Sequence, residues 1–153
     1  GNYILGGGGF ASRLTEEVRE KRGLAYSVYS YFMPLAQPGP FQIGLQTKRE
    51  QAAEALDVTR ATLRRFIAEG PSTDEVRRAK QNLIGSFPLR LDSNGKILGY
   101  LSMIGYYKLP LDYLDQFANN VDKITLAQVK GAFQRHVDTK TMVTVIVGGD
   151  GKK

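Results

Sequence analysis

The spacing of apolar and polar residues predicts a helix followed by a hairpin near the start of the chain. Residues 12–21 begin with Ser12, carry acidic side chains early and basic side chains late, and are soon followed by Gly23, a combination typical of a short helix. From Leu24 to Phe32, and again from Phe41 to Thr47, apolar and polar positions alternate with the period of a strand. The prolines and glycine between these stretches predict a hairpin with a long loop.

Helical spacing governs most of the remaining chain. Capping-box patterns at Ser72 with Glu75 and at Thr125 with Gln128 mark two helix starts. An apolar, β-branched run from Met142 to Val147 predicts one further strand. The predicted helices cover residues 50–69, a stretch from about 73 to a disturbance at Pro88, about 94–107, 111–119, and a last stretch that begins after Thr125 and includes Val137.

The order of these elements predicts an α+β fold, with helices packed on one face of a mainly antiparallel sheet. We expect a single domain over residues 1–153, because a chain of this size can bury a substantial core. The chain opens almost directly into a glycine run, like the tail of an element whose beginning is elsewhere. We therefore expect a C-terminal fragment, with further strands of the sheet preceding residue 1.

The composition narrows the chemistry that the chain can carry. It contains no cysteine and one histidine, His136, so it offers neither a thiolate nucleophile nor the three ligands of a hydrolytic zinc site. The formal charge of +6 is spread over helical segments without interleaved aromatic residues, which argues against a nucleic-acid partner. No apolar stretch approaches the ~20 residues that a membrane span requires.

Four consecutive glycines, Gly6, Gly7, Gly8 and Gly9, precede the first predicted helix. A helix start attracts anions, but a phosphate loop needs Lys and Ser or Thr after its last glycine, and this chain continues with Phe10 instead. Two alternatives remain open. The run is either a flexible link between helices or a place where the backbone passes close to an extended peptide.

Residues 5–32 closely resemble the C-terminal homologous domain of the M16 (insulinase or pitrilysin-like) metallopeptidases. The resemblance rests on the glycine run followed by Ser12-Arg13-Leu14, on a helix that ends in an arginine (residues 17–22), and on Gly23-Leu24-Ala25-Tyr26 opening a strand. The downstream order of elements also agrees with that family. The resemblance implies an α+β domain of the LuxS/MPP-like type within an enclosed peptidase chamber.

The resemblance also implies how the chain contributes to a reaction. In that family one half carries a His-x-x-Glu-His zinc motif, and the other contributes an arginine and a tyrosine that reach the substrate; by position these are Arg19 and Tyr26. Gly6, Gly7, Gly8, Gly9 and Ser12 are implied substrate-binding positions. Zinc would be held by the partner domain or subunit, and this chain alone is expected to be inactive.

Elementary chemistry supports the implied roles of the pair. A guanidinium offers several donors to peptide carbonyls, and a phenol can donate to an oxyanion. A tight turn at Gly23 could bring the tips of Arg19 and Tyr26 together. The strand alternation places Tyr29 and Tyr31 on the face opposite Tyr26, where we expect surface or partner contacts. The alternative is that both residues serve only the fold. Arg19 would then interact favourably with the dipole at the helix C-terminus, and Tyr26 would pack on the sheet.

Three functions follow from these patterns. The first is the non-zinc, substrate-binding half of a zinc metallopeptidase, which cleaves peptides together with a zinc-bearing domain or subunit. The second is a catalytically inactive assembly or core subunit of a larger complex. The third, a basic nucleic-acid module, would require a clustered positive face. Family analogy suggests a bacterial periplasmic protein, although a chain without cysteine suits cytosol and periplasm equally.

Overall fold

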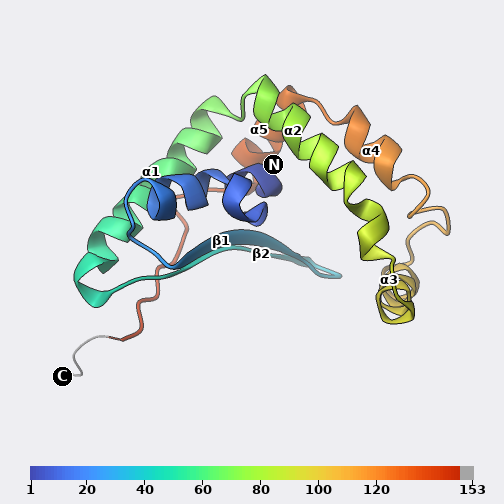
Figure 1. Ribbon diagram of the computed structural model, residues 1–153, viewed down its shortest axis with the longest axis horizontal. Coiled ribbons are helices and arrows are strands. Elements are labelled where there is room, and N and C mark those ends of the chain that lie inside the picture. Colours follow the sequence, from blue (N-terminus) through green and yellow to red (C-terminus); the bar gives the residue numbers. More distant parts are fainter. Residues whose placement is uncertain (149–153) are drawn as a thin grey trace. The chain divides into compact units, whose positions relative to one another are not determined.

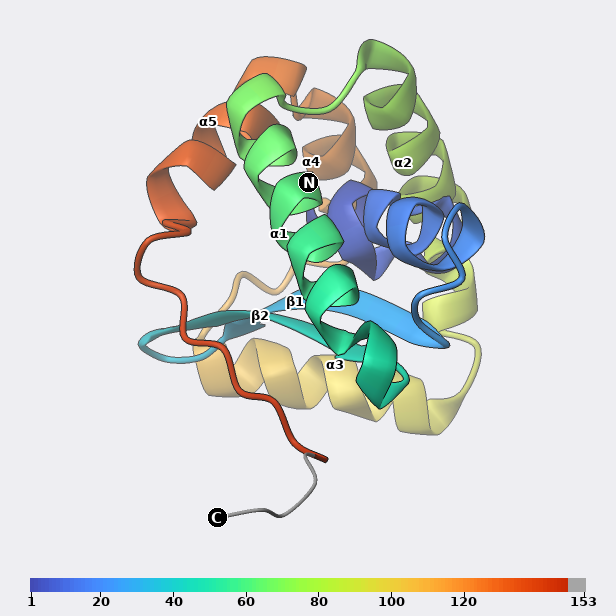
Figure 2. The same ribbon diagram turned by 90° about the vertical axis from the view of Figure 1, so that its left-hand side faces the viewer.

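The computed structural model describes residues 1–148 and has the expected α+β composition, with several helices and an antiparallel sheet (Figures 1 and 2). The chain forms two compact units, one from Gly1–Pro71 with the segment that starts at Leu126, and one from Ser72–Thr125. The expectation of a single domain stays a prediction.

Short helical segments of the π or 3-10 type carry the label η. The elements are η1 (Tyr3–Gly7), η2 (Gly9–Ala11), η3 (Thr15–Glu20), β1 (Ser27–Pro34), β2 (Pro38–Gln46), η4 (Arg49–Gln51), α1 (Ala52–Glu69), α2 (Thr73–Gly85), η5 (Phe87–Arg90), α3 (Asn94–Tyr107), α4 (Phe117–Lys123) and α5 (Leu126–His136).

The predicted hairpin is confirmed by the pairing of β1 with β2, but the predicted long loop is wrong. The strands extend to Pro34 and from Pro38, and only residues 35–37 lie between them. Prolines are tolerated there because the end of a two-stranded sheet needs few ladder hydrogen bonds. The strands are antiparallel, with Val28 opposite Leu45 and Phe32 opposite Phe41. One face of the hairpin packs against the N-terminal helical segments, which Figure 1 shows in blue above the strands. The opposite face presents Tyr29 and Tyr31, whose side chains are exposed and whose rings stack, as the alternation predicted.

Four phenylalanines join the hairpin to the long helices of the first unit. Phe133 of α5 meets the rings of Phe32, Phe41 and Phe66, with centroid distances of 5.7, 6.2 and 4.8 Å. Phe133 is the centre of this cluster, and Phe66 of α1, which packs against it, is fully buried. Edge-to-face aromatic pairs of this kind add to the apolar burial, so the cluster fixes α1 and α5 on the inner face of β1 and β2.

The N-terminal helix forms where it was predicted, but its central part is a π-helix. Within η3 the backbone N–H of Lys21 donates to the carbonyl of Glu16, five residues back. Leu14 and Val18 on this segment are completely buried. The wider turn still directs this apolar stripe into the core between β1 and α1.

In the second unit, Ser72–Thr125, the predicted start of α2 and the predicted bounds of α3 are confirmed. Ser72 and Glu75 form both hydrogen bonds of the capping box that starts α2. α3 has the predicted bounds, and α2 gives way to η5 next to Pro88. Among the described residues, no helix is both long and apolar enough to span a bilayer.

Two element predictions need correction. Met142–Val147 is not a strand, because no described segment pairs with it and an unpaired extended backbone does not count as sheet. The stretch 111–119 is only partly helical: turns lead up to α4, which starts at Phe117 rather than Leu111.

Candidate functional site

A glycine-capped turn links η3 to the hairpin and brings the two candidate residues together. Gly23 has a φ of +62°, a left-handed conformation that favours glycine. Its backbone N–H donates to the carbonyl of Arg19 at 2.8 Å, and that of Leu24 donates to the carbonyl of Val18 at 2.9 Å. These bonds close the end of η3 and reverse the chain towards β1.

Arg19 and Tyr26 meet on the surface beside this turn. The Arg19 guanidinium carbon lies over the Tyr26 ring, 5.7 Å from its centroid. The Arg19 side chain is 37% exposed, and its Nε lies 3.5 Å from a carboxylate oxygen of Glu20. Tyr26 is 81% exposed. The pair therefore presents a cation and a phenol to solvent from one place.

Tyr26 departs from the strand alternation that placed it with the core-facing residues. Leu24, Ala25 and Val28 around it are buried, whereas the Tyr26 side chain points outward. The reason is that Tyr26 lies in a bend just before β1 begins at Ser27. Its backbone N–H nevertheless donates to the carbonyl of Gln46 at 3.0 Å, which ties the bend to the end of β2.

Phe10 is a residue of this site that the sequence patterns did not single out. Its side chain is 74% exposed on η2, and the Arg19 guanidinium carbon lies 4.9 Å from its ring centroid. No periodicity surrounds it, so the available signal was only an aromatic residue directly after a glycine run. The structure thus brings Phe10, Arg19 and Tyr26 into one cluster, which we call the Phe10–Arg19–Tyr26 cluster.

Glu17 anchors the helical segment that carries Arg19. Its carboxylate lies 2.9 Å from Lys21 Nζ, 2.8 Å from Arg22 and 3.2 Å from Arg65 of α1. Hydrogen bonds from Arg22 and Lys21, with a further one from Arg65, lower the pKa of Glu17 to about 2. The carboxylate is therefore ionised under all ordinary conditions and links η3 to α1.

The glycine run is a folded segment rather than a flexible link. Gly6 is buried, and a Cβ there would lie 2.4 Å from Ser30 Oγ and 2.7 Å from the Ser30 nitrogen. Gly7 and Gly8 pack on the first residues of η1, whereas Gly9 is exposed with a φ of +58°. Close packing of η1 on β1 is thus one reason for this composition. Substrate contact by the run stays a prediction.

Ser12 is held inside the protein. It is 1% exposed, and its hydroxyl donates to the Gly9 carbonyl at 2.8 Å and lies 3.0 Å from Thr15 Oγ1. Its neighbours also serve the fold, since Arg13 donates to the carbonyl of Gly70 at the end of α1 and Leu14 is buried. Ser12 closes the loop that presents Phe10; its predicted role in substrate binding is not tested by these contacts.

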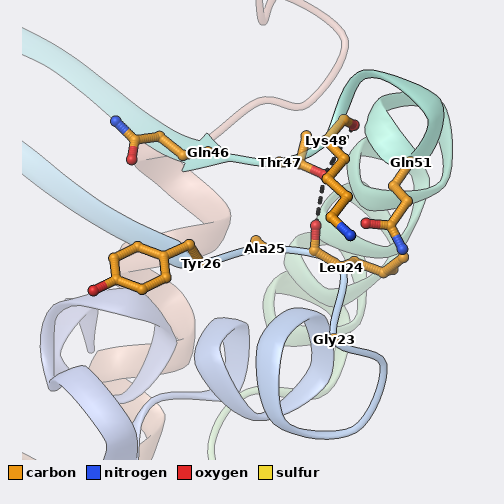
Figure 3. Close-up of a pocket in the computed structure, with 8 residues that line it drawn as sticks. All are labelled: Gly23, Leu24, Ala25, Tyr26, Gln46, Thr47, Lys48 and Gln51. Carbon is orange, nitrogen blue, oxygen red and sulfur yellow. Dashed lines mark hydrogen bonds between the residues drawn. The ribbon is translucent and has the colours of Figure 1, made fainter.

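A shallow depression of about 280 Å³ adjoins Tyr26 at the base of the hairpin (Figure 3). Tyr26 stands at one end and Gln51 at the other, and the Thr47 hydroxyl donates to the Leu24 carbonyl between them. The lining residues are Gly23, Leu24, Ala25, Tyr26, Gln46, Thr47, Lys48 and Gln51. A chain lying beside Tyr26 could place a side chain in this depression.

The residues that the structure describes do not fit a zinc site. Within residues 1–148, no group of three or more His, Cys, Asp or Glu side chains could hold a metal ion. His136, at the end of α5, is exposed.

Sequence comparisons identify relatives of this chain. The family model described as "Peptidase M16 inactive domain" matches residues 1–83. A Helicobacter pylori protein, "Non-peptidase homolog YmxG", is 33% identical over 153 residues, covering 98% of this chain and 34% of that protein. A Bacillus subtilis protein, "Uncharacterized zinc protease YmxG", is 31% identical over 157 residues, covering 98% of this chain and 36% of that protein.

A solved structure agrees with the fold. The crystal structure of the peptidase M16 inactive domain from Pseudomonas fluorescens has a TM-score of 0.82 and 44% sequence identity, over 90% of this chain and 33% of that one. This chain therefore spans about a third of the length of these relatives.

Proposed function

Because the chain belongs to the peptidase M16 family and matches its inactive domain, we propose that it is the substrate-gripping, non-zinc half of a peptidase. An inactive M16 domain implies pairing with a catalytic M16 domain, which holds the zinc. In this proposal the hydrolytic step takes place on that other half. The present chain binds and orients the peptide that is cleaved.

The exposed pair Arg19 and Tyr26 is the observation that carries the proposal. The guanidinium and the phenol lie together beside the turn at Gly23, with the Tyr26 side chain 81% exposed. Arg19 can donate to the carbonyls of an extended peptide, and the Tyr26 hydroxyl can donate to the oxygen that becomes negative during peptide hydrolysis. Neither residue can carry out hydrolysis alone, which is consistent with the non-zinc half of a peptidase.

The glycine run would complete the peptide-binding surface. Gly7 and Gly9 are exposed, and Gly9 directly precedes Phe10 of the cluster; a backbone without side chains allows a peptide to approach closely. Gly6 and Ser12 are buried, and in this proposal they contribute by shaping the loop that carries the exposed glycines and Phe10.

The test is a peptidase assay on unstructured peptides with this chain alone, with its zinc-bearing half, and with complexes that carry Arg19→Ala or Tyr26→Phe. We expect no turnover by the chain alone and turnover by the complex. Each variant should lose at least ~10-fold in kcat/KM, since removal of one oxyanion donor typically lowers turnover by about 10²–10³-fold. Wild-type turnover by both variants would reject the catalytic role.

The runner-up function is a catalytically inactive assembly or core subunit. It is favoured by the similarity to the Helicobacter pylori protein that is named a non-peptidase homolog. The same assay separates the two functions, because with an assembly subunit the turnover of the complex would not depend on the residues at positions 19 and 26.

A further inference from the structure

Phe10 has a position that packing does not explain. A phenylalanine normally belongs to the core, but this side chain is 74% exposed, and its ring contact within the described residues is with the guanidinium of Arg19. The backbone that presents it is well held. Ser12 donates both its hydroxyl and its backbone N–H to the Gly9 carbonyl, at 2.8 and 3.0 Å, and Gly9 adopts a left-handed φ of +58°.

Arg19 needs such a contact if it is to meet a substrate in one orientation. An arginine side chain has many rotamers, and binding is weakened when they must be restricted at the moment of binding. Its ion pair with Glu20 is long, at 3.5 Å, and Glu20 is itself exposed. The ring of Phe10, at 4.9 Å, is closer to the guanidinium than the ring of Tyr26, at 5.7 Å.

We propose that Phe10 is a positioning residue for the Arg19–Tyr26 pair. Its ring covers part of the guanidinium and restricts its orientations, while the in-plane N–H groups stay available to peptide carbonyls. Since the same guanidinium lies over Tyr26, Phe10 also limits the movement of the phenol. Position 10 therefore requires an aromatic side chain. The catalytic part of this inference rests on the proposed function.

The first experiment tests the contact on the chain itself. The Arg19 side-chain NMR resonances should lie upfield through the ring current of Phe10 and should move downfield in Phe10→Leu. They should stay in place in Phe10→Tyr, which keeps a ring. The matched control is Tyr106→Leu, which removes an equally exposed aromatic side chain, 73% against 74%, whose ring partner is Tyr107. Unchanged Arg19 resonances in Phe10→Leu would overturn the proposal.

The second experiment measures kcat/KM in the complex with the zinc-bearing half. An exposed cation–π contact corresponds to about a two- to five-fold change in an equilibrium. We expect a loss of that size in Phe10→Leu, none in Phe10→Tyr or Tyr106→Leu, and no further loss when Phe10→Leu is added to Arg19→Ala. An equal loss in both Arg19 backgrounds, or no loss in Phe10→Leu, would reject the positioning role.

The two experiments separate the inference from the proposed function. If Arg19→Ala turns over peptides normally, the catalytic part of the inference fails, whatever the resonances show, and the proposed function fails as well if Tyr26→Phe is also normal. If Arg19→Ala is impaired while Phe10→Leu matches wild type, only the role of Phe10 fails.

Discussion

Glu17 shows how one charged residue can support the site without touching a substrate. Three cations, Lys21, Arg22 and Arg65, surround its carboxylate and lower its pKa from 4.5 to about 2. Because the folded pKa is the lower one, the stability that Glu17 contributes is present above about pH 5 and is lost as the pH falls from 4.5 towards 2.

We therefore predict that Glu17→Gln lowers the free energy of unfolding at pH 7 by about 1–3 kcal/mol, with Lys21, Arg22 and Arg65 left without their shared partner. The loss of stability between pH 5 and 2 should also become less steep in this variant. Urea unfolding at several pH values measures both effects. Glu54→Gln, at an exposed position of α1, is the control and should change stability little. Parallel pH profiles for wild type and Glu17→Gln would contradict the prediction.

At the scale of elements, the geometry of the site depends on how η3 ends. Gly23, in the turn after η3, has a φ of +62°, and a Cβ built there has nothing within 4 Å, so a substitution would be strained by its backbone conformation rather than by a clash. The same turn sets the approach of Tyr26 to Arg19. A single residue thus controls the connection between a helical segment and the hairpin.

We predict that Gly23→Ala destabilises the protein by about 1–2 kcal/mol, the cost of placing an ordinary residue in the left-handed conformation. Gly99→Ala is the matched control, because Gly99 lies within α3 with equally open space around it but without a positive φ. That change should stabilise by up to ~1 kcal/mol through helix propensity. Thermal unfolding of both variants measures the difference, and a neutral Gly23→Ala would show that the turn tolerates a side chain.

Elements whose ends are set by neighbouring residues in the sequence could be predicted. Elements that depend on pairing with a distant segment could not. The capping box at Ser72 and the bounds of α3 follow from neighbouring residues, and so does the glycine turn at Gly23 that follows η3. Met142–Val147 has a strand composition but no pairing partner in the described chain, and a strand forms only by pairing.

The candidate site could also be predicted only in part. The roles of Arg19 and Tyr26 were predicted from the resemblance to a family, and the turn between them was predicted from Gly23. Their distance depends on tertiary structure, because the Tyr26 bend is tied to Gln46, which is distant in sequence. Phe10 could not be found from the sequence, since an exposed aromatic residue in a loop follows no period.

At the scale of the whole molecule, the two compact units differ in how much apolar surface they bury. The first unit contains the aromatic cluster around Phe133 and buried side chains from η1, η3, β1, α1 and α5. In Ser72–Thr125, all of which is described, Ala79 and Ile104 are the buried hydrophobic residues. α3 is an apolar helix, yet its larger side chains are exposed, with Leu98 at 64% and Leu101 at 55%.

This difference predicts unequal local stability. Segments with few buried apolar contacts open at lower free energy than a packed core, so the amides of α3 should exchange with solvent at least ~10-fold faster than those of α1 from Thr59 to Phe66, after correction for intrinsic rates. Hydrogen–deuterium exchange read by mass spectrometry measures this on the intact chain. The comparison is internal, because both helices are hydrogen-bonded along their length and differ mainly in the burial of their side chains. Equal protection of α3 and α1 would contradict the prediction, because it would mean that Leu98 and Leu101 are covered in solution.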